Sequence, residues 1–170
     1  MKSLLLGCGN NRQKKIWMGE ENKNWSGDLV TVDMNPDCKP DLIWDLDKHP
    51  LPFPDETFDE IGMYDVLEHL GRQGDWRGFF DEFADYWRLL KPGGVFGIIV
   101  PINADSLSDP GHTRFFSKTQ FGFLNQNFYR DNLEKGTQVT DYRWFWKKSF
   151  DILHNEAIET HHIGVILKKA

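Results

Sequence analysis

An apolar segment that runs into a glycine turn near the N-terminus constrains the fold of this chain more than any other feature. Three leucines at residues 4–6 lead directly into the turn at residues 7–9, Gly-Cys-Gly. The apolar run is typical of a central parallel strand over residues 2–6, covered on both faces. Glycine permits positive φ and lets a ligand approach the backbone. The pattern favours an open α/β sheet with a ligand site after its first strand, although a Gly-x-Gly turn also serves as an ordinary connection.

A second apolar segment ends on a carboxylate at an informative spacing. Residues 29–32, Leu-Val-Thr-Val, predict a strand that ends at Asp33. A carboxylate about two dozen residues after a glycine turn is the ribose-binding residue of doubly wound folds. The alternative is an Asp that only caps a turn. Residues 11–28 between the two segments are polar and lack a helical period, so we expect no full-length helix there.

The remaining pattern completes an α/β architecture. We predict strands over residues 41–47, 58–63 and 95–100 and an amphipathic helix over residues 75–90. The aromatic side chains of that helix recur at spacings of three and four, which is typical of a core face. Strands that alternate with turns and a helix in this way predict a doubly wound, Rossmann-like, mostly parallel sheet.

The C-terminal part gives weaker signals. Ser117 and Gln120 form a capping-box pattern, so a helix is expected after Ser117. Residues 125–140 are polar and mixed and predict no element. Residues 142–154 and 158–168 predict two long strands joined at residues 155–157, a terminal antiparallel hairpin. The histidines at 161 and 162 are interpreted as part of an exposed edge.

Composition restricts the class of partner. The 170 residues, 39% of them apolar, are typical of one domain over residues 1–170. The formal net charge is −6 and no run of Lys or Arg is long enough to form a basic stripe, so we expect no nucleic-acid partner. Two cysteines, Cys8 and Cys38, are too few for a disulfide framework. The apolar N-terminal run breaks at Gly7, too early for a signal peptide or a membrane span, so a cytoplasmic protein is expected.

Several motifs in order resemble a known family. They are Leu-Leu-Gly-Cys-Gly at 5–9, Val-Asp at 32–33, Trp-Asp-Leu at 44–46, Leu-Pro-Phe-Pro-Asp-Glu-Thr-Phe-Asp at 51–59, Val-Leu-Glu-His-Leu at 66–70, Leu-Leu-Lys-Pro-Gly-Gly at 89–94 and His-Thr-Arg-Phe-Phe-Ser at 112–117. From residue 4 to about residue 121 the chain resembles a class I S-adenosylmethionine-dependent methyltransferase of the type 11 kind. The resemblance implies S-adenosylmethionine as the cofactor and a last strand that is inserted antiparallel.

The resemblance also implies the cofactor-binding residues. The turn would hold the methionine part, Asp33 the ribose and Asp45 the adenine amino group, with the Leu46 backbone beside the ring. The full expected set is Gly7, Cys8, Gly9, Asp33, Met34, Asp45, Leu46, Tyr64 and Asp65. The chain departs from the family pattern at Asn10–Asn11, where a third glycine is usual, and in the shortened segment that follows.

A metal site is a further hypothesis. Asp65, Glu68 and His69 have the spacing of methyltransferases that hold a divalent cation, and His112 is a candidate fourth ligand. Magnesium, manganese or zinc would suit this donor set. The competing interpretation is an ordinary helix start without a metal. His69 and His112 are also the candidate catalytic bases.

The expected activity is methyl transfer to a small molecule or sugar. The aromatic residues Tyr142, Trp144, Phe145 and Trp146 are candidates for the wall of an acceptor pocket, with core packing as the alternative. A non-catalytic cofactor-binding protein or regulatory partner of a methyltransferase is a second interpretation, motivated by the shortened segment. A nicotinamide oxidoreductase is a distant third, because the third glycine of its fingerprint is missing. The hairpin and the aromatic residues would allow a homodimer.

Overall fold

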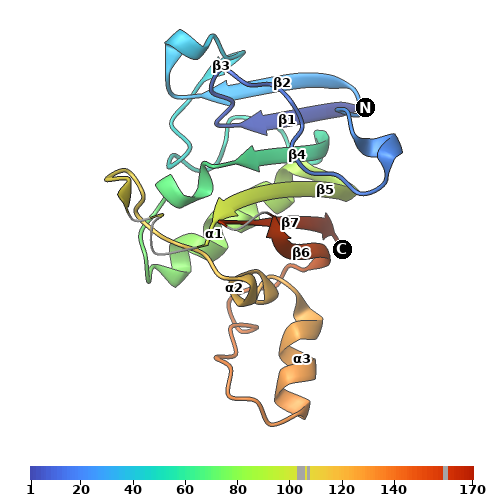
Figure 1. Ribbon diagram of the computed structural model, residues 1–170. Coiled ribbons are helices and arrows are strands. Elements are labelled where there is room, and N and C mark those ends of the chain that lie inside the picture. Colours follow the sequence, from blue (N-terminus) through green and yellow to red (C-terminus); the bar gives the residue numbers. More distant parts are fainter. Residues whose placement is uncertain (103–105, 107, 159–160) are drawn as a thin grey trace.

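One seven-stranded sheet organises the structure. The computed structural model describes residues 1–170 except 103–105, 107 and 159–160. The strand order is β3-β2-β1-β4-β5-β7-β6 (Figure 1). The strands are β1 Lys2–Leu6, β2 Asp28–Asp33, β3 Leu42–Ile43, β4 Phe58–Tyr64, β5 Leu90–Pro101, β6 Phe150–Ile158 and β7 His162–Lys169.

The direction of the strands confirms the expected fold class. The strands β1, β2, β3, β4 and β5 pair in parallel. The pairs β5–β7 and β6–β7 are antiparallel, as expected of the terminal hairpin. Because β2 and β4 lie on opposite sides of β1, the order of the sheet reverses between β1 and β4. Open α/β sheets bind ligands at such a switch point.

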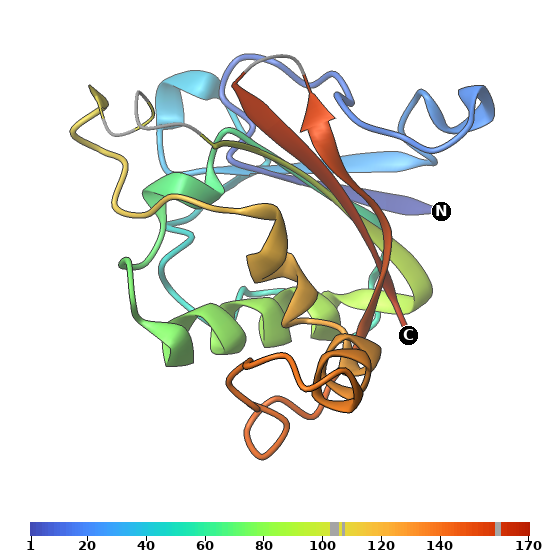
Figure 2. The same cartoon turned by 60° about the horizontal axis from the view of Figure 1, so that its bottom comes forward.

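The helices cover one face of the sheet, as Figure 2 shows. The helix α1, Trp76–Leu89, begins at Asp75, whose side chain accepts a hydrogen bond from the Gly78 amide. Its apolar face buries Phe80, Phe83, Tyr86 and Leu89 in the main core. The prediction of an amphipathic helix here is confirmed. The strand β5 begins directly after it, five residues earlier than the apolar pattern indicates.

An irregular segment covers the other face. Between β1 and β2 the described chain forms only a short 3₁₀ helix, η1, Glu20–Asn22, as the missing helical period predicts. Ile16 and Trp25 from this segment pack with Leu5, Tyr64 and Ile166 in a second, smaller core. The close approach requires small residues in the sheet, since a Cβ on Gly97 would lie 2.9 Å from Ile16 Cγ2.

The strand β3 is shorter than predicted. It spans Leu42–Ile43 instead of residues 41–47. The Asp41 side chain accepts hydrogen bonds from the Thr31 amide and hydroxyl, and Asp45 lies in the turn that follows. These local side-chain contacts compete with continued strand pairing. Two further 3₁₀ helices, η2 Pro36–Cys38 and η3 Leu67–His69, lie beyond the ends of β2 and β4.

The C-terminal third required two corrections. A helix, α3, Gln126–Glu134, forms where no element was expected. The side chain of its N-cap, Asn125, accepts hydrogen bonds from the amides of Asn127 and Phe128. Tyr129 is the single buried residue of the helix, so the apolar period of its sequence is weak. The helix α2, Lys118–Gly122, has the predicted capping box at Ser117.

The predicted hairpin exists with different bounds. Strand β6 begins at Phe150 instead of residue 142, and residues 155–157, the expected turn, lie within β6. The Trp146 indole donates to the Leu124 carbonyl oxygen at 3.1 Å, and Gln126 donates to the Trp146 carbonyl oxygen at 3.0 Å. These contacts hold the preceding segment against the helices instead of the sheet. No helix in the described part of the chain has the length and apolar character needed to cross a membrane.

Candidate functional site

The carboxyl ends of β1, β2 and β4 meet at one edge of the sheet, because these strands are parallel neighbours. The turn at residues 7–9 lies there. The amides of Gly7 and Cys8 donate to the Val32 carbonyl oxygen at 2.8 and 3.1 Å. A Cβ on Gly7 would lie 2.3 Å from Val66 Cγ2, whereas a Cβ on Gly9 would meet nothing within 4 Å. Packing therefore requires glycine at position 7, and only Gly9 leaves the backbone open to a ligand.

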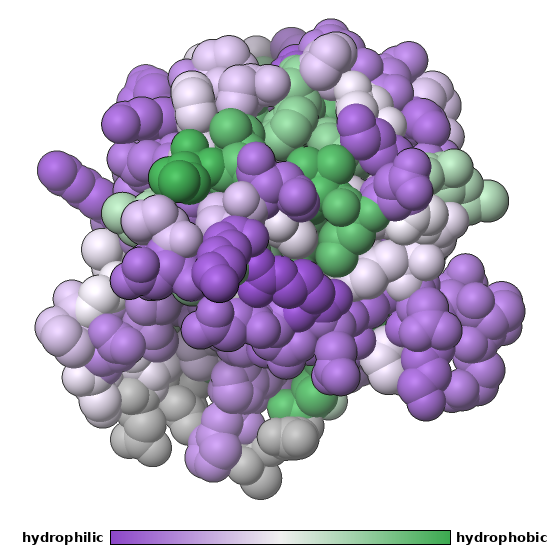
Figure 3. All heavy atoms as spheres, turned by 90° about the horizontal axis from the view of Figure 1, so that it is seen from above, coloured by the Kyte–Doolittle hydropathy of each residue, from purple (hydrophilic) through white to green (hydrophobic). Residues whose placement is uncertain are grey.

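Asp33 joins this turn to the end of β2. One carboxylate oxygen accepts from the Gly9 amide at 2.8 Å and the other from the Asn35 amide at 2.9 Å. Each ionised oxygen has a further lone pair, so the carboxylate can still accept from hydroxyl groups of a ligand. Met34 beside it is 69% exposed. Figure 3 views the molecule from the top of Figure 1, where β2 and β3 lie, and shows apolar surface among polar side chains.

Asp45 and Leu46 lie beyond β3. Asp45 is partly exposed, accepts from the Asp47 amide at 3.1 Å and lies 3.7 Å from the Lys48 ammonium. Leu46 is buried in the main core, so only its backbone can face a ligand. The polar and apolar parts expected for an adenine site thus lie on consecutive residues.

Tyr64 and Asp65 lie at the end of β4 and have different surroundings. The Tyr64 ring is buried under Trp25, and burial raises the pKa of its hydroxyl. Asp65 adopts φ +57°, and its carboxylate lies 3.0 Å from the Lys15 ammonium and 3.2 Å from His162 Nε2. The Tyr64 side chain therefore belongs to the second core, while the Asp65 carboxylate is held by two nitrogen groups. His162 therefore contacts Asp65, and the interpretation of this histidine as part of an exposed edge is wrong.

Glu68, His69 and His112 come together beside this edge. One ligand atom of each lies within 4.8 Å of those of the other two. The rings of His69 and His112 are 4.5 Å apart between centroids and nearly perpendicular. Glu68 is 2% exposed, and burial raises the pKa of its carboxyl group to about 7. The structure thus brings three of the four candidate metal ligands together, and Asp65 is engaged elsewhere.

The segment after β5 holds His112 in place. The amides of Thr113 and Arg114 donate to the Glu68 carbonyl oxygen at 2.9 and 3.2 Å. The Arg114 guanidinium donates to the Leu67 carbonyl oxygen at 3.0 Å and to Glu82 on α1 at 2.6 Å. The buried ion pair fixes this segment against η3 and α1.

These positions match a family of known proteins. A family model described as a methyltransferase domain matches residues 4–98, more than half of the chain and including the turn, Asp33 and Glu68. The chain belongs to the methyltransferase domain family. A curated relative of this domain, the sterol 24-C-methyltransferase erg6 of Aspergillus fumigatus, is 28% identical over 109 residues. The match covers 62% of this chain and 25% of the relative, so the chain spans about a quarter of that protein's length.

Solved structures of methyltransferases have the same fold as this domain. A SAM dependent methyltransferase from Aquifex aeolicus gives a TM-score of 0.57 at 14% identity, with 100% of this chain and 82% of that chain covered. The methyltransferase in a complex with the Haloferax volcanii Trm112 methyltransferase activator gives 0.60 at 13% identity, with coverage of 99% and 82%. Likeness at these identities shows the fold. Together with the family match, it confirms the expected family and fold class.

Two basic residues at the site of this methyltransferase domain are not predicted by the sequence patterns. The Arg12 guanidinium donates to the carbonyl oxygens of Gly9, Cys38 and Lys39 and so ties the turn to the loop after β2. Lys15 pairs with Asp65. The available signal was the basic cluster at residues 12–15, directly after the turn. It was missed because the segment has no regular period from which to place side chains.

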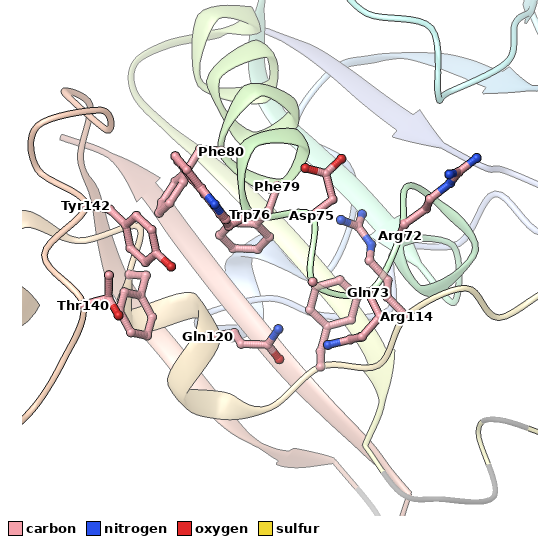
Figure 4. Close-up of a pocket in the computed structure, with 13 residues that line it drawn as sticks. Arg72, Gln73, Asp75, Trp76, Phe79, Phe80, Arg114, Gln120, Thr140 and Tyr142 are labelled. Carbon is pink, nitrogen blue, oxygen red and sulfur yellow. The ribbon is translucent and has the colours of Figure 1, made fainter.

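A cavity of about 290 Å³ lies at the start of α1. Its walls combine aromatic rings with polar groups, as Figure 4 shows for Trp76, Tyr142 and Gln120. Arg114 lines it and also contacts the backbone of η3, so the cavity borders the Glu68 segment. Of the four aromatic residues expected either to wall a pocket or to pack, Tyr142 lines this cavity and Trp146 is 3% exposed in the core.

Proposed function

We propose that this chain transfers a methyl group from S-adenosylmethionine to a small molecule or sugar. The observation that carries the proposal is the Asp33 carboxylate, hydrogen-bonded to the open Gly9 turn at the switch point of a sheet whose family is that of methyltransferase domains. This is the place where a doubly wound sheet receives a nucleoside.

The residues fit the proposed cofactor. Asp33 has lone pairs for the ribose hydroxyls, and exposed Met34 offers apolar surface beside it for an adenine ring. Arg12 and Lys15 supply positive charge for the carboxylate of the methionine tail, and Asp65 supplies negative charge for its ammonium group. Bound S-adenosylmethionine supplies an activated methyl group, so the protein has mainly to orient the acceptor in line with the methyl–sulfur bond.

The cavity beside α1 supports a small acceptor. Aromatic faces such as Trp76 and Phe79 suit an apolar or sugar ring, while Arg72 and Gln120 offer hydrogen bonds that fix its orientation. Where no metal ion occupies their nitrogen atoms, His69 and His112 are the proposed bases for an acceptor that must lose a proton. Three expectations stay predictions. The chain is expected to have no nucleic-acid partner, to allow a homodimer and to be located in the cytoplasm.

Calorimetric titration with S-adenosylhomocysteine, and in parallel with NAD, tests the proposal. We expect selective binding of S-adenosylhomocysteine, reduced on the order of 10- to 100-fold in Asp33→Ala, which removes hydrogen bonds to a charged acceptor. Asp37→Ala, an exposed carboxylate in the neighbouring η2, is the matched control and should bind like the wild type. Absence of binding to the wild type would overturn the proposal.

Acceptor screening separates the enzyme from a regulatory partner. The purified chain is offered a panel of small molecules and sugars with S-adenosylmethionine, and release of S-adenosylhomocysteine is measured. Binding of the cofactor without turnover on any acceptor, restored by adding a second methyltransferase chain, would favour the regulatory interpretation. The structural feature that motivates the regulatory interpretation is the irregular segment at residues 11–27, which covers the second face of the sheet without an α-helix.

A further inference from the structure

Two buried polar atoms beside the strand ends lack a hydrogen-bond partner. Glu68 Oε2 and His112 Nδ1 have none within the described part of the chain. Glu68 is 2% exposed, and a carboxylate oxygen that is buried without a partner is costly to the fold. A group from outside the chain would remove this cost.

The spacing of the side chains leaves room for such a group. His112 Nε2 lies 3.9 Å from Glu68 Oε1 and 3.8 Å from Asp109 Oδ2, both too long for hydrogen bonds. One ligand atom from each of Glu68, His69 and His112 nevertheless lies within 4.8 Å of the others. The three side chains therefore point their ligand atoms toward a common point, and they do not hydrogen-bond to one another.

The tautomer of His69 suits a ligand role. Its Nδ1 lies 3.1 Å from the Gly111 carbonyl oxygen, which can only accept a hydrogen bond. A proton on Nδ1 leaves Nε2 with a free lone pair, and metal-binding histidines are commonly held by a carbonyl in this way. The same loop carries His112, and the His69 ring that Gly111 holds lies 4.5 Å from the His112 ring between centroids.

We propose that Glu68, His69 and His112 bind one divalent transition-metal ion. Two imidazole nitrogens and one carboxylate suit Zn²⁺, Mn²⁺ or Fe²⁺, and three protein ligands leave a coordination position open to water or another oxygen ligand. Magnesium is the weaker candidate because it prefers an all-oxygen shell. The site stands on the geometry of these side chains and does not depend on the proposed methyl transfer.

Calorimetric titration of the metal-free full chain with ZnCl₂ and MnCl₂ tests the site. We expect one ion per chain, and an affinity lowered on the order of 100-fold or more in Glu68→Gln and in His69→Ala. His69 is exposed, so its replacement tests the site even where a buried substitution disturbs folding. His154→Gln, a histidine on β6, is the control for adventitious binding and should leave the affinity unchanged.

Thermal unfolding gives a second readout, since an ion that binds only the folded chain raises its melting temperature. Zn²⁺ should raise the melting temperature of the wild type and of His154→Gln, and should not raise that of His69→Ala. Equal affinities and equal shifts in wild type and both site variants would overturn the proposal, as would the lack of any binding of Zn²⁺ or Mn²⁺ to the wild type. Loss of cofactor binding with metal binding intact would contradict only the proposed function.

Discussion

The Asp33 carboxylate accepts a hydrogen bond from the Gly9 amide at 2.8 Å and thereby joins the ends of two neighbouring strands. The second oxygen holds the Asn35 amide at the start of the next loop. The same residue that would receive the ribose therefore also shapes the turn on which the cofactor would rest. A substitution there changes both the ligand contact and its support.

Replacing Asp33 by Asn tests this double role. The amide keeps one acceptor oxygen and turns an NH₂ group toward a backbone donor, so we expect a loss of about 1–2 kcal/mol in the free energy of unfolding. S-adenosylhomocysteine affinity should fall as well. Urea unfolding and calorimetry measure the two effects separately. A stability loss with unchanged affinity would show that Asp33 only supports the turn.

The two glycines of the turn should differ in their response to substitution. In Gly7→Ala the new Cβ meets Val66 at 2.3 Å and the residue keeps a positive φ, so we expect a destabilisation of about 3 kcal/mol. Gly9→Ala has the positive φ but open space, and about 1–2 kcal/mol is expected. Val66→Ala should rescue part of the Gly7→Ala loss in a double-mutant cycle measured by urea unfolding. Equal losses for the two glycines would contradict this steric account.

Gly9→Ala should also weaken ligand binding beyond its effect on stability. The added methyl group projects into the space that the ligand would use, so we expect weaker binding of S-adenosylhomocysteine while the protein remains folded. Calorimetry below the melting temperature measures this. Wild-type affinity in this variant would mean that the ligand does not approach the turn.

The buried ion pair between Arg114 and Glu82 should be sensitive to the loss of one partner. Both side chains are 6% exposed and 2.6 Å apart. Arg114→Met leaves the Glu82 carboxylate without its counter-ion, so we expect a loss of about 3–5 kcal/mol. The double variant Arg114→Met with Glu82→Gln should recover part of it, and additive losses would show that the pair is not coupled. Chemical unfolding measures all three variants.

Asp85 should contribute to the acid sensitivity of the fold. Burial alone would raise the pKa of Asp85, but hydrogen bonds from His49, Leu51 and Arg88 outweigh it and lower the pKa below 3.8. The folded state then binds fewer protons than the unfolded state, so this stabilisation is present above about pH 3.8 and is lost as the pH falls through the lower folded-state pKa.

Asp85→Asn checks this pH dependence. We expect a loss of about 2–3 kcal/mol near neutral pH, because hydrogen bonds to a charged group are weakened, and a smaller loss in acid. Asp151→Asn, an exposed residue of β6, is the control and should show no such trend. Urea unfolding at several pH values provides the measurement. A loss that stays constant into acid would exclude the proposed linkage.

The parts that sequence patterns predicted well are those fixed by neighbouring residues. The run before Gly7, the strand ending at Asp33 and the aromatic period of α1 each specify a local geometry through sterics and burial. The capping box at Ser117 is equally local. The helix α3 was missed because it buries only Tyr129 and so leaves no apolar period to detect.

The sequence by itself determined the parallel sheet, the glycine turn and the carboxylate that follows it, because periodicity and backbone freedom act over a few residues. Only the tertiary structure decided which side chains meet at the strand ends. In the folded chain Lys15 and His162 pair with the Asp65 carboxylate, and His112 lies beside Glu68. Such pairings depend on how a distant segment packs, and no local pattern encodes the packing of residues that lie far apart in the chain.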